Sequence, residues 1–226
     1  MDARIGGILL DGGGGTRLAA AAPLPAGGKG AIEVGGAALR SRALACLGAV
    51  AGPIVVVAAP LRPLGALPRG TLVVRDSLPG AGPLAALADG LAALLAAPGA
   101  AVEAVVLMAC DLPLVDPALP AFLVDRLRGA PPEVVWVVPQ VGGHPQVLLS
   151  ALRPALAPAV REALAAGLRA PRALLGHLAA TRPGSVALLP EDALRRVDPD
   201  LAGLRDVDTP ADLEMVRDIL RKRGET

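Results

Sequence analysis

Short apolar runs rich in β-branched residues alternate along this chain with longer segments rich in alanine and leucine. The run Val102–Ala109 is the most constraining, because Val105, Val106, Leu107 and Met108 make it apolar on both faces. A strand of this kind has to lie inside a sheet that helices cover on both sides, as in parallel sheets built from β–α–β units. The alternation therefore predicts an α/β fold with a mainly parallel sheet.

The same pattern locates the individual elements. We expect strands at Arg4–Leu10, Ile54–Ala58, Leu72–Arg75, Val102–Ala109, Val134–Val138, Gln146–Leu149 and Ser185–Leu189. We expect helices at Ala37–Ala49, Pro83–Ala97, Pro117–Arg128, Leu152–Ala166, Arg172–Ala179 and Pro210–Arg221. The last helix has the clearest start, with Thr209 as N-cap and Pro210 at the first helical position. Because no repeat or linker divides the chain, the sequence predicts one domain over residues 1–226.

Charge and composition argue against large or extended partners. The 22 basic residues nearly balance the 21 acidic ones, so no positive field attracts nucleic acid. Phe122 and Trp136 are the only aromatic residues, which leaves little to stack on the bases of a single strand. The best candidate for a membrane span, Leu91–Cys110, is interrupted by Pro98 and Glu103. We expect no nucleic-acid partner and no membrane association.

The two cysteines, Cys46 and Cys110, lie far apart in apolar stretches. This placement is typical of buried free thiols in a reducing compartment, and it favours a cytoplasmic protein.

A glycine-rich segment directly follows the first predicted strand. It reads Leu10, Asp11, Gly12, Gly13, Gly14, Gly15, Thr16, Arg17, Leu18. Consecutive glycines let backbone N–H groups point at an anion, and an arginine adds a planar fork suited to phosphate oxygens. The segment is neither a Walker A loop nor a dinucleotide fingerprint, because it lacks their lysine and glycine spacing. It predicts a triphosphate site, and the alternative is an ordinary glycine turn.

Lysine is rare in this chain, since only Lys29 and Lys222 occur among the 22 basic residues. Lys222 is close to the end of the sequence, whereas Lys29 is a compact ammonium group near the glycine-rich segment. We expect Lys29 to neutralise phosphate charge; the alternative is a solvated loop lysine.

Five sets of residues occur in an order that is specific for one protein family, although each set alone is only modest evidence for it. They are Leu10, Gly12, Gly13, Arg17, Leu18, Lys29 and Gly36–Leu39; Asp76–Leu84; Ala109–Pro113; Gly143–Pro145; and Asp206–Pro210. In this order, over almost the whole chain, the sequence resembles the molybdenum cofactor guanylyltransferases of the MobA-like nucleotidyltransferase family. The resemblance implies a single-domain, Rossmann-like, three-layer nucleotidyltransferase fold.

The resemblance also implies an activity, namely transfer of GMP from GTP to the phosphate of molybdopterin with release of pyrophosphate. The substrates would be GTP and molybdopterin or the molybdenum cofactor, and Mg²⁺ would be the cofactor. Protein partners would be molybdoenzymes or other cofactor-biosynthesis proteins. Fold alone leaves open a molybdopterin cytidylyltransferase, a sugar-phosphate nucleotidyltransferase and a non-catalytic nucleotide-binding homologue.

Roles for individual residues follow from the same resemblance. The residues implied to bind the nucleotide are Leu10, Asp11, Gly12, Gly13, Gly15, Thr16, Arg17, Lys29, Asp76, Gly82, Pro83 and Asp111. Arg17, Lys29 and Asp111 would be catalytic. Asp111 would ligate Mg²⁺, as expected for a carboxylate just past the carboxyl end of a central parallel strand; otherwise it is a turn or N-cap aspartate. Asp208 would be a second metal or substrate contact, or simply the neighbour of an N-cap.

Three features depart from the family pattern. Asp11 stands where the family has a small residue, the stretch Leu18–Gly28 lengthens the path from arginine to lysine, and Ala58 and Ala59 stand where an asparagine is usual. An unpaired Asp11 carboxylate facing the phosphates would repel them, so that Asp11→Ala would strengthen GTP binding. If Asp11 instead shares Mg²⁺ with Asp111, the same change would weaken metal-dependent binding. Unchanged binding would mean that Asp11 points away and that neither account is right.

Overall fold

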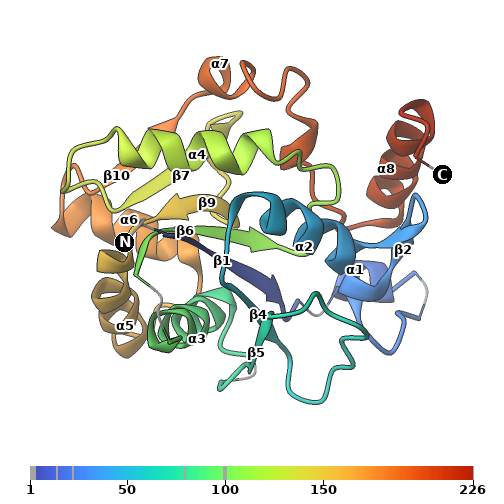
Figure 1. Ribbon diagram of the computed structural model, residues 1–226, viewed down its shortest axis with the longest axis horizontal. Helices are drawn as coiled ribbons and strands as arrows, with labels where there is room; N and C mark the ends of the chain where they lie inside the picture. Colours follow the sequence, from blue (N-terminus) through green and yellow to red (C-terminus); the bar gives the residue numbers. More distant parts are fainter. Residues whose placement is uncertain (1–3, 14, 22, 79, 99–100, 226) are drawn as a thin grey trace.

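A mainly parallel sheet runs through the middle of the molecule (Figure 1). The computed structural model describes residues 4–13, 15–21, 23–78, 80–98 and 101–225. The strands of the sheet are β1 (Arg4–Asp11), β4 (Ile54–Ala58), β5 (Leu72–Arg75), β6 (Val102–Ala109), β7 (Trp136–Val141), β8 (His144–Pro145), β9 (Leu149–Leu152) and β10 (Val186–Leu189). Their order is β10-β7-β9-β6-β1-β4-β5, with β8 beside β7. Strand β9 is antiparallel to β6 and β7, whereas β1, β4, β5 and β6 are mutually parallel.

Helices cover both faces of this sheet. They are α1 (Thr16–Ala19), α2 (Leu39–Val50), α3 (Pro83–Ala96), α4 (Ala118–Arg128), α5 (Ala157–Ala165), α6 (Pro171–Thr181), α7 (Glu191–Leu194) and α8 (Pro210–Lys222). Helices α2 and α4 lie on one face, and α3 and α5 lie on the other (Figure 1). Alternate residues of β1 enter two separate cores, because Leu9 packs in the core with Leu47 of α2 and Ile8 in the core with Leu91 of α3. The predicted α/β fold with three layers and a mainly parallel sheet is confirmed.

A smaller third core lies between an N-terminal segment of the chain and the C-terminal helix α8. Strands β2 (Glu33–Val34) and β3 (Ala37–Ala38) form a hairpin, and its Val34 shares a buried cluster with Val216 and Leu220 of α8. Helix α8 starts as predicted: the Thr209 Oγ1 accepts a hydrogen bond from the Asp212 backbone N–H, and the Asp212 carboxylate accepts one from the Thr209 N–H. The third core holds α8 and the segment before it against the β2–β3 hairpin.

Two of the predicted elements are wrong in detail. The residues Gln146–Leu149, expected to form one strand, are divided between two elements. The Gln146 N–H donates to Pro139 O and closes the short β7–β8 hairpin, whereas Leu149 is the first residue of β9. The helix expected at Leu152–Ala166 begins only at Ala157, since Leu152 pairs with Val105 in the antiparallel ladder. A 3₁₀ turn at Pro154–Leu156 separates the strand from the helix. Tertiary pairing outweighs local helix propensity here.

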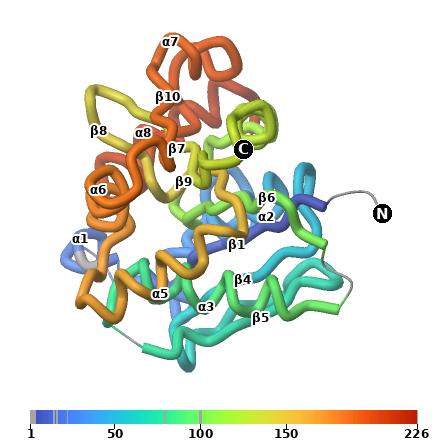
Figure 2. Tube along the Cα trace, turned by 90° about the vertical axis from the view of Figure 1, so that its left-hand side faces the viewer, coloured from blue at the N-terminus to red at the C-terminus, as the bar shows by residue number. Residues whose placement is uncertain are grey.

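The parallel strands β1, β4 and β6 end at the same edge of the sheet, where Leu10 is in register with Val57 and with Ala109. In open α/β sheets this carboxyl edge is where ligands bind. Figure 2 shows α1 and β8 on this side of the molecule and the start of β1 on the opposite side.

In the described ranges, no helix is both long and apolar enough to cross a membrane.

Helix α3 packs closely on the sheet at Gly90. A Cβ at residue 90 would lie 2.7 Å from Ile8 Cγ2, whereas a Cβ at Gly48 of α2 would meet nothing within 4 Å. We expect Gly90→Ala to lower the free energy of unfolding by about 1 kcal/mol or more through overpacking. Gly48→Ala, the matched control, should raise it by about 0.5–1 kcal/mol through helix propensity. Urea unfolding followed by Trp136 fluorescence measures both, and equal stabilities would contradict the close approach.

Candidate active site

A cavity of about 350 Å³ opens at the carboxyl edge of the sheet, between the glycine-rich segment, the end of β6 and the start of α3. The described residues that line it are Leu10, Gly12, Gly13, Lys29, Asp76, Gly80, Gly82, Pro83, Ala86, Ala109, Cys110, Asp111 and Leu148. Eight of the residues predicted from the sequence are in this set: Leu10, Gly12, Gly13, Lys29, Asp76, Gly82, Pro83 and Asp111. The structure thus brings together segments that are separated by up to about half of the chain. We call this space the glycine-loop cavity.

The glycines at this cavity leave room for a ligand. A Cβ at Gly12 or Gly13 would meet no protein atom within 4 Å, so packing within the protein does not require glycine at either position. Gly82 differs, because its φ is +87° and a Cβ there would lie 2.6 Å from Arg169 O. Gly82 is the N-cap of α3, and the positive end of that helix is therefore directed toward the cavity.

Lys29 forms the electrostatic centre of the site. Its Nζ donates to Asp111 Oδ2 at 2.8 Å and to Asp208 Oδ1 at 2.5 Å, and its side chain is only 5% exposed. Burial alone would lower the pKa of Lys29, but the carboxylates of Asp111 and Asp208 outweigh burial and raise it. Lys29 is therefore a permanent cation that connects the end of β6 to the segment before α8.

Arg17 and Asp206 extend this charged cluster. The Arg17 Nη1 donates to Asp208 Oδ2 at 3.0 Å, with the Arg17 side chain 73% exposed. Arg17 therefore reaches the cluster from outside the glycine-loop cavity. Desolvation, followed by the nearby carboxylates of Asp208 and Asp111, raises the pKa of Asp206 above its usual value. The Val207 N–H donates to Asp111 O at 3.0 Å, which explains why these acidic residues gather at one place.

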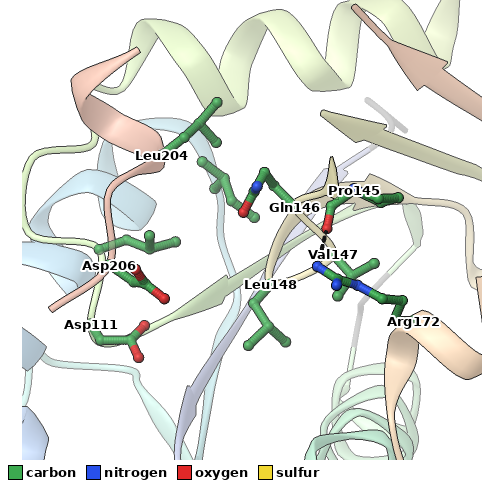
Figure 3. Close-up of a pocket in the computed structure, with 10 residues that line it drawn as sticks. Asp111, Pro145, Gln146, Val147, Leu148, Arg172, Leu204 and Asp206 are labelled. Atoms are coloured by element: carbon green, nitrogen blue, oxygen red, sulfur yellow. Dashed lines mark hydrogen bonds between the residues drawn. The ribbon is translucent and has the colours of Figure 1, made fainter. Parts of the chain in front are cut away.

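A second cavity, of about 170 Å³, lies on the other side of Asp111. It is lined by Asp111, Leu112, Pro145, Gln146, Val147, Leu148, Leu149, Arg172, Leu204 and Asp206. Figure 3 shows the carboxylates of Asp111 and Asp206 at one end and the guanidinium group of Arg172 at the other. The Arg172 Nη2 donates to Pro145 O at 3.1 Å. Because Asp111 and Leu148 line both cavities, the two spaces adjoin at the Asp111 carboxylate.

Asp11 does not take either of the positions expected from the sequence. Its side chain is fully buried, and its Oδ2 accepts a hydrogen bond from Arg40 Nε at 2.5 Å. It is not among the described residues that line the glycine-loop cavity. The expectations that Asp11 faces the phosphates unpaired, or that it shares a metal ion with Asp111, are therefore both wrong. The physical reason is that Arg40 supplies a buried cation on the side away from the cavity.

The remaining predicted residues lie at the margin of the site. Gly15 has a φ of +55° and packs near Leu24, and Thr16 begins α1, with a side chain that lies outside the described parts. Neither is among the described lining residues of either cavity. Gly14 of the glycine-rich segment and Pro79 of the Asp76–Leu84 segment lie outside the described residues. His144 is exposed in β8, next to the second cavity.

Several residues that the fold brings to the site are not predicted from the sequence. Leu148 and Arg172 lie in segments with no recognisable signal, and Arg40 reaches Asp11 only because α2 packs beside β1. Gly80 and Cys110 are different, because both lie within segments that carried the family resemblance. Cys110 is buried at the base of the cavity; burial, followed by the Asp11 and Asp111 carboxylates, raises the pKa of its thiol well above the usual value.

Asp111 and Asp208 were also predicted as metal ligands, and their chemistry suits Mg²⁺. Both present carboxylate oxygens to one point, now occupied by Lys29 Nζ. Within the described ranges, no group of three or more His, Cys, Asp or Glu side chains is arranged to hold a metal ion. Mg²⁺ is usually bound by one or two carboxylates together with phosphate oxygens, so Asp111 fits an ion that arrives with a polyphosphate. Asp208 could join as a ligand only by releasing Lys29 or Arg17, which take its two oxygens in this structure.

The chain is similar to known proteins over most of its length. Residues 7–181 match the family model described as the MobA-like NTP transferase domain. The chain belongs to this family. A probable molybdenum cofactor guanylyltransferase of Mycobacterium tuberculosis is 32% identical over 214 residues, which cover 92% of this chain and 91% of the relative. This member of the family is therefore a nucleotidyltransferase.

Solved structures share the fold of this nucleotidyltransferase. The molybdopterin-guanine dinucleotide biosynthesis protein A from Archaeoglobus fulgidus superimposes with a TM-score of 0.72 at 21% identity, covering 96% of this chain and 99% of the other. The 2-C-methyl-D-erythritol 4-phosphate cytidylyltransferase from Thermus thermophilus has a TM-score of 0.66 at 21% identity, covering 95% and 98%. Because the names of these two proteins indicate different bases and different acceptors, the fold alone does not select the substrates.

The shared ion pair of Lys29 predicts a specific loss of stability. We expect Lys29→Met to lower the free energy of unfolding by about 1–3 kcal/mol, the scale of hydrogen bonds between charged groups. Because the pKa of Lys29 is raised in the folded state, the stabilisation is complete below the ordinary lysine value of 10.5 and is lost as the pH rises through the folded-state pKa.

Urea unfolding at several pH values tests this prediction. Lys222→Met is the matched control, because Lys222 is an exposed residue of the last turn of α8. The difference between the two variants should stay constant between about pH 6 and 9 and shrink above the ordinary lysine pKa. Equal stabilities of the two methionine variants at neutral pH would contradict the ion-pair network.

Proposed function

We propose that this nucleotidyltransferase transfers GMP from GTP to the phosphate of molybdopterin and releases pyrophosphate. Its relative in Mycobacterium tuberculosis is named a probable molybdenum cofactor guanylyltransferase, and the Archaeoglobus fulgidus protein is named molybdopterin-guanine dinucleotide biosynthesis protein A. The observation that carries the proposal is that two cavities adjoin at Asp111. A transfer between two phosphates needs a donor and an acceptor on opposite sides of one phosphorus atom.

The glycine-loop cavity suits the nucleotide. Pro83 and Ala86 are apolar lining residues that would contact the base and ribose, with Asp76 as a polar group for them. Gly12, Gly13 and Lys29 would take the phosphates at the other end. The Lys29 ammonium group has three N–H donors, of which Asp111 and Asp208 use two among the described contacts. One donor is left for a phosphate oxygen.

The second cavity suits the acceptor. Its Asp111 end adjoins the nucleotide phosphates, and Arg172 and Gln146 offer polar groups farther away. The attacking phosphate is already an anion, so the protein has to position the two substrates and neutralise charge, with no proton to remove from the nucleophile. Lys29 and Arg17 would balance the charge that develops on the departing pyrophosphate. When bound by Asp111, and by Asp208 if it releases Lys29 or Arg17, Mg²⁺ would supply further positive charge to the phosphate oxygens.

We also propose that the domain extends over residues 1–226. The family model ends at residue 181, but Asp208 belongs to the Lys29 cluster and α8 covers the third core. A chain that ended at residue 181 would lack one of the two carboxylates that hold Lys29.

Asp111 should be essential for turnover. We expect Asp111→Asn to lower kcat by at least about two orders of magnitude, because it removes an anionic ligand and a partner of Lys29 from a charge-stabilised reaction. Asp116→Asn is the matched control, since Asp116 caps the Ala118 N–H at the start of α4 and is exposed. Pyrophosphate release measures both variants. A rate near that of the wild type in Asp111→Asn would overturn the assignment.

The choice of substrates is tested in one further assay. We expect pyrophosphate release with Mg-GTP and molybdopterin together, and much less with Mg-CTP or with a sugar phosphate as acceptor. Preference for Mg-CTP would make the protein a cytidylyltransferase, and preference for a sugar phosphate would change the acceptor. Binding of Mg-GTP without any pyrophosphate release would indicate a non-catalytic nucleotide-binding protein.

A further inference from the structure

Asp11, at the start of the glycine-rich segment, forms a buried ion pair with Arg40 of α2. The Asp11 side chain is 0% exposed and the Arg40 side chain is 5% exposed. Removing two charges from water is costly, and a buried pair is often no more stabilising than apolar side chains of similar size. A pair of this kind at the back of the site therefore needs a reason beyond stability.

Arg40 gathers three separate segments of backbone around its guanidinium group. Its Nε donates to Asp11 Oδ2, its Nη1 donates to Leu64 O at 2.8 Å, and its Nη2 donates to Gly27 O at 2.9 Å. Gly27 is two residues before Lys29. One planar group thus fixes the end of β1 relative to the start of the turn that carries Lys29.

Asp11 contacts the same turn from the other side of Lys29. A Cβ at Gly30 would lie 2.3 Å from Asp11 Oδ1, so the carboxylate packs directly on the backbone of residue 30. The turn itself is a 3₁₀ turn of three residues, Lys29–Ala31, with no side-chain cap. Such a short turn has little stability of its own. Its position depends on the contacts that Asp11 and Arg40 make on both sides of Lys29.

Arg62 connects the glycine-rich segment to this arrangement. Its Nη1 donates to Asp11 O at 2.8 Å and to Gly13 O at 3.2 Å. Its guanidinium carbon would lie 2.7 Å from a Cβ at Gly28. The carbonyl groups of the loop are thereby directed toward Arg62.

We propose that Asp11 and Arg40 form a positioning pair that holds the backbone on both sides of Lys29 and so sets the reach of its ammonium group toward the polyphosphate of the substrate. The proposal rests on the proposed function in one respect, that Lys29 contacts phosphate. Neither side chain of the pair touches the substrate. The pair acts through Lys29, and its loss lowers polyphosphate affinity without changing the residues that contact the ligand.

Two variants of the pair separate positioning from charge. Arg40→Lys keeps a cation for Asp11 but lacks the planar fork that also reaches Gly27 and Leu64. The double variant Asp11→Ala/Arg40→Met removes both charges and leaves no unpaired buried ion. Arg42→Met is the matched control, because Arg42 lies on the same helix and donates to Val34 O, Gly35 O and Glu225, away from the Lys29 turn.

Calorimetry with inorganic tripolyphosphate and with Mg-GTP measures the first effect. We expect both pair variants to bind tripolyphosphate at least about tenfold more weakly than the wild type, and Arg42→Met to stay within about twofold. In a Lys29→Met background the Arg40→Lys change should cause no further loss, because a positioning residue acts only through the group that it positions. Unchanged affinity in Arg40→Lys, or an equal loss with and without Lys29, would overturn the proposal.

Hydrogen exchange supplies a readout that needs no ligand. The amides of Gly28, Ala31 and Ile32 donate within the turn to Pro25, Gly28 and Lys29 carbonyl groups. These amides should exchange faster in Arg40→Lys while the core strand β6 keeps its protection. Equal protection of the turn in wild type and variant would overturn the proposal even if binding changed. If the wild-type protein binds neither tripolyphosphate nor Mg-GTP, the proposed function fails, and the exchange experiment still decides whether the pair holds the turn.

Discussion

The ammonium group of Lys29 holds the site together. It is buried, and its two carboxylate partners come from the end of β6 and from the segment before α8, 82 and 179 residues away along the chain. A buried cation requires such partners, because desolvation would otherwise favour the neutral amine. The sheet, the segment before the C-terminal helix and the short turn at Lys29–Ala31 thus meet at one point, and Asp111, one of the two partners, lines both cavities.

Charge around this point is balanced locally. Asp208 is shared by Lys29 and the exposed Arg17, while Asp206 has a raised pKa because burial and its acidic neighbours disfavour its charged form. Asp11 would add one more negative charge to this acidic edge. Its pairing with Arg40 on the far side of β1 removes that charge from the phosphate side. An aspartate that looks unfavourable for phosphate binding in the sequence is therefore compatible with it in the structure.

The sequence predicted the layers, the central strands and most residues of the glycine-loop cavity, because these depend on local patterns. Apolar runs such as that of β6 indicate burial on both faces, and glycines such as Gly82 mark positions where a side chain would collide with backbone. The errors concern contacts between distant segments. The start of α5 was misplaced because β9 pairs with β6, and the role of Asp11 was misread because Arg40 comes from a helix that carries no signal for it.

The topology of the sheet explains why two cavities adjoin at Asp111. Strand β6 is parallel to β1 on one side and antiparallel to β9 on the other. At the carboxyl end of β6, β1 therefore ends and β9 begins. At the carboxyl end of β6, the glycine-rich segment after β1 borders one cavity, and the segment that leads into β9 borders the other. A residue that follows β6 therefore faces both spaces. Two substrates held in these spaces would therefore meet beside Asp111, where one carboxylate is within reach of both.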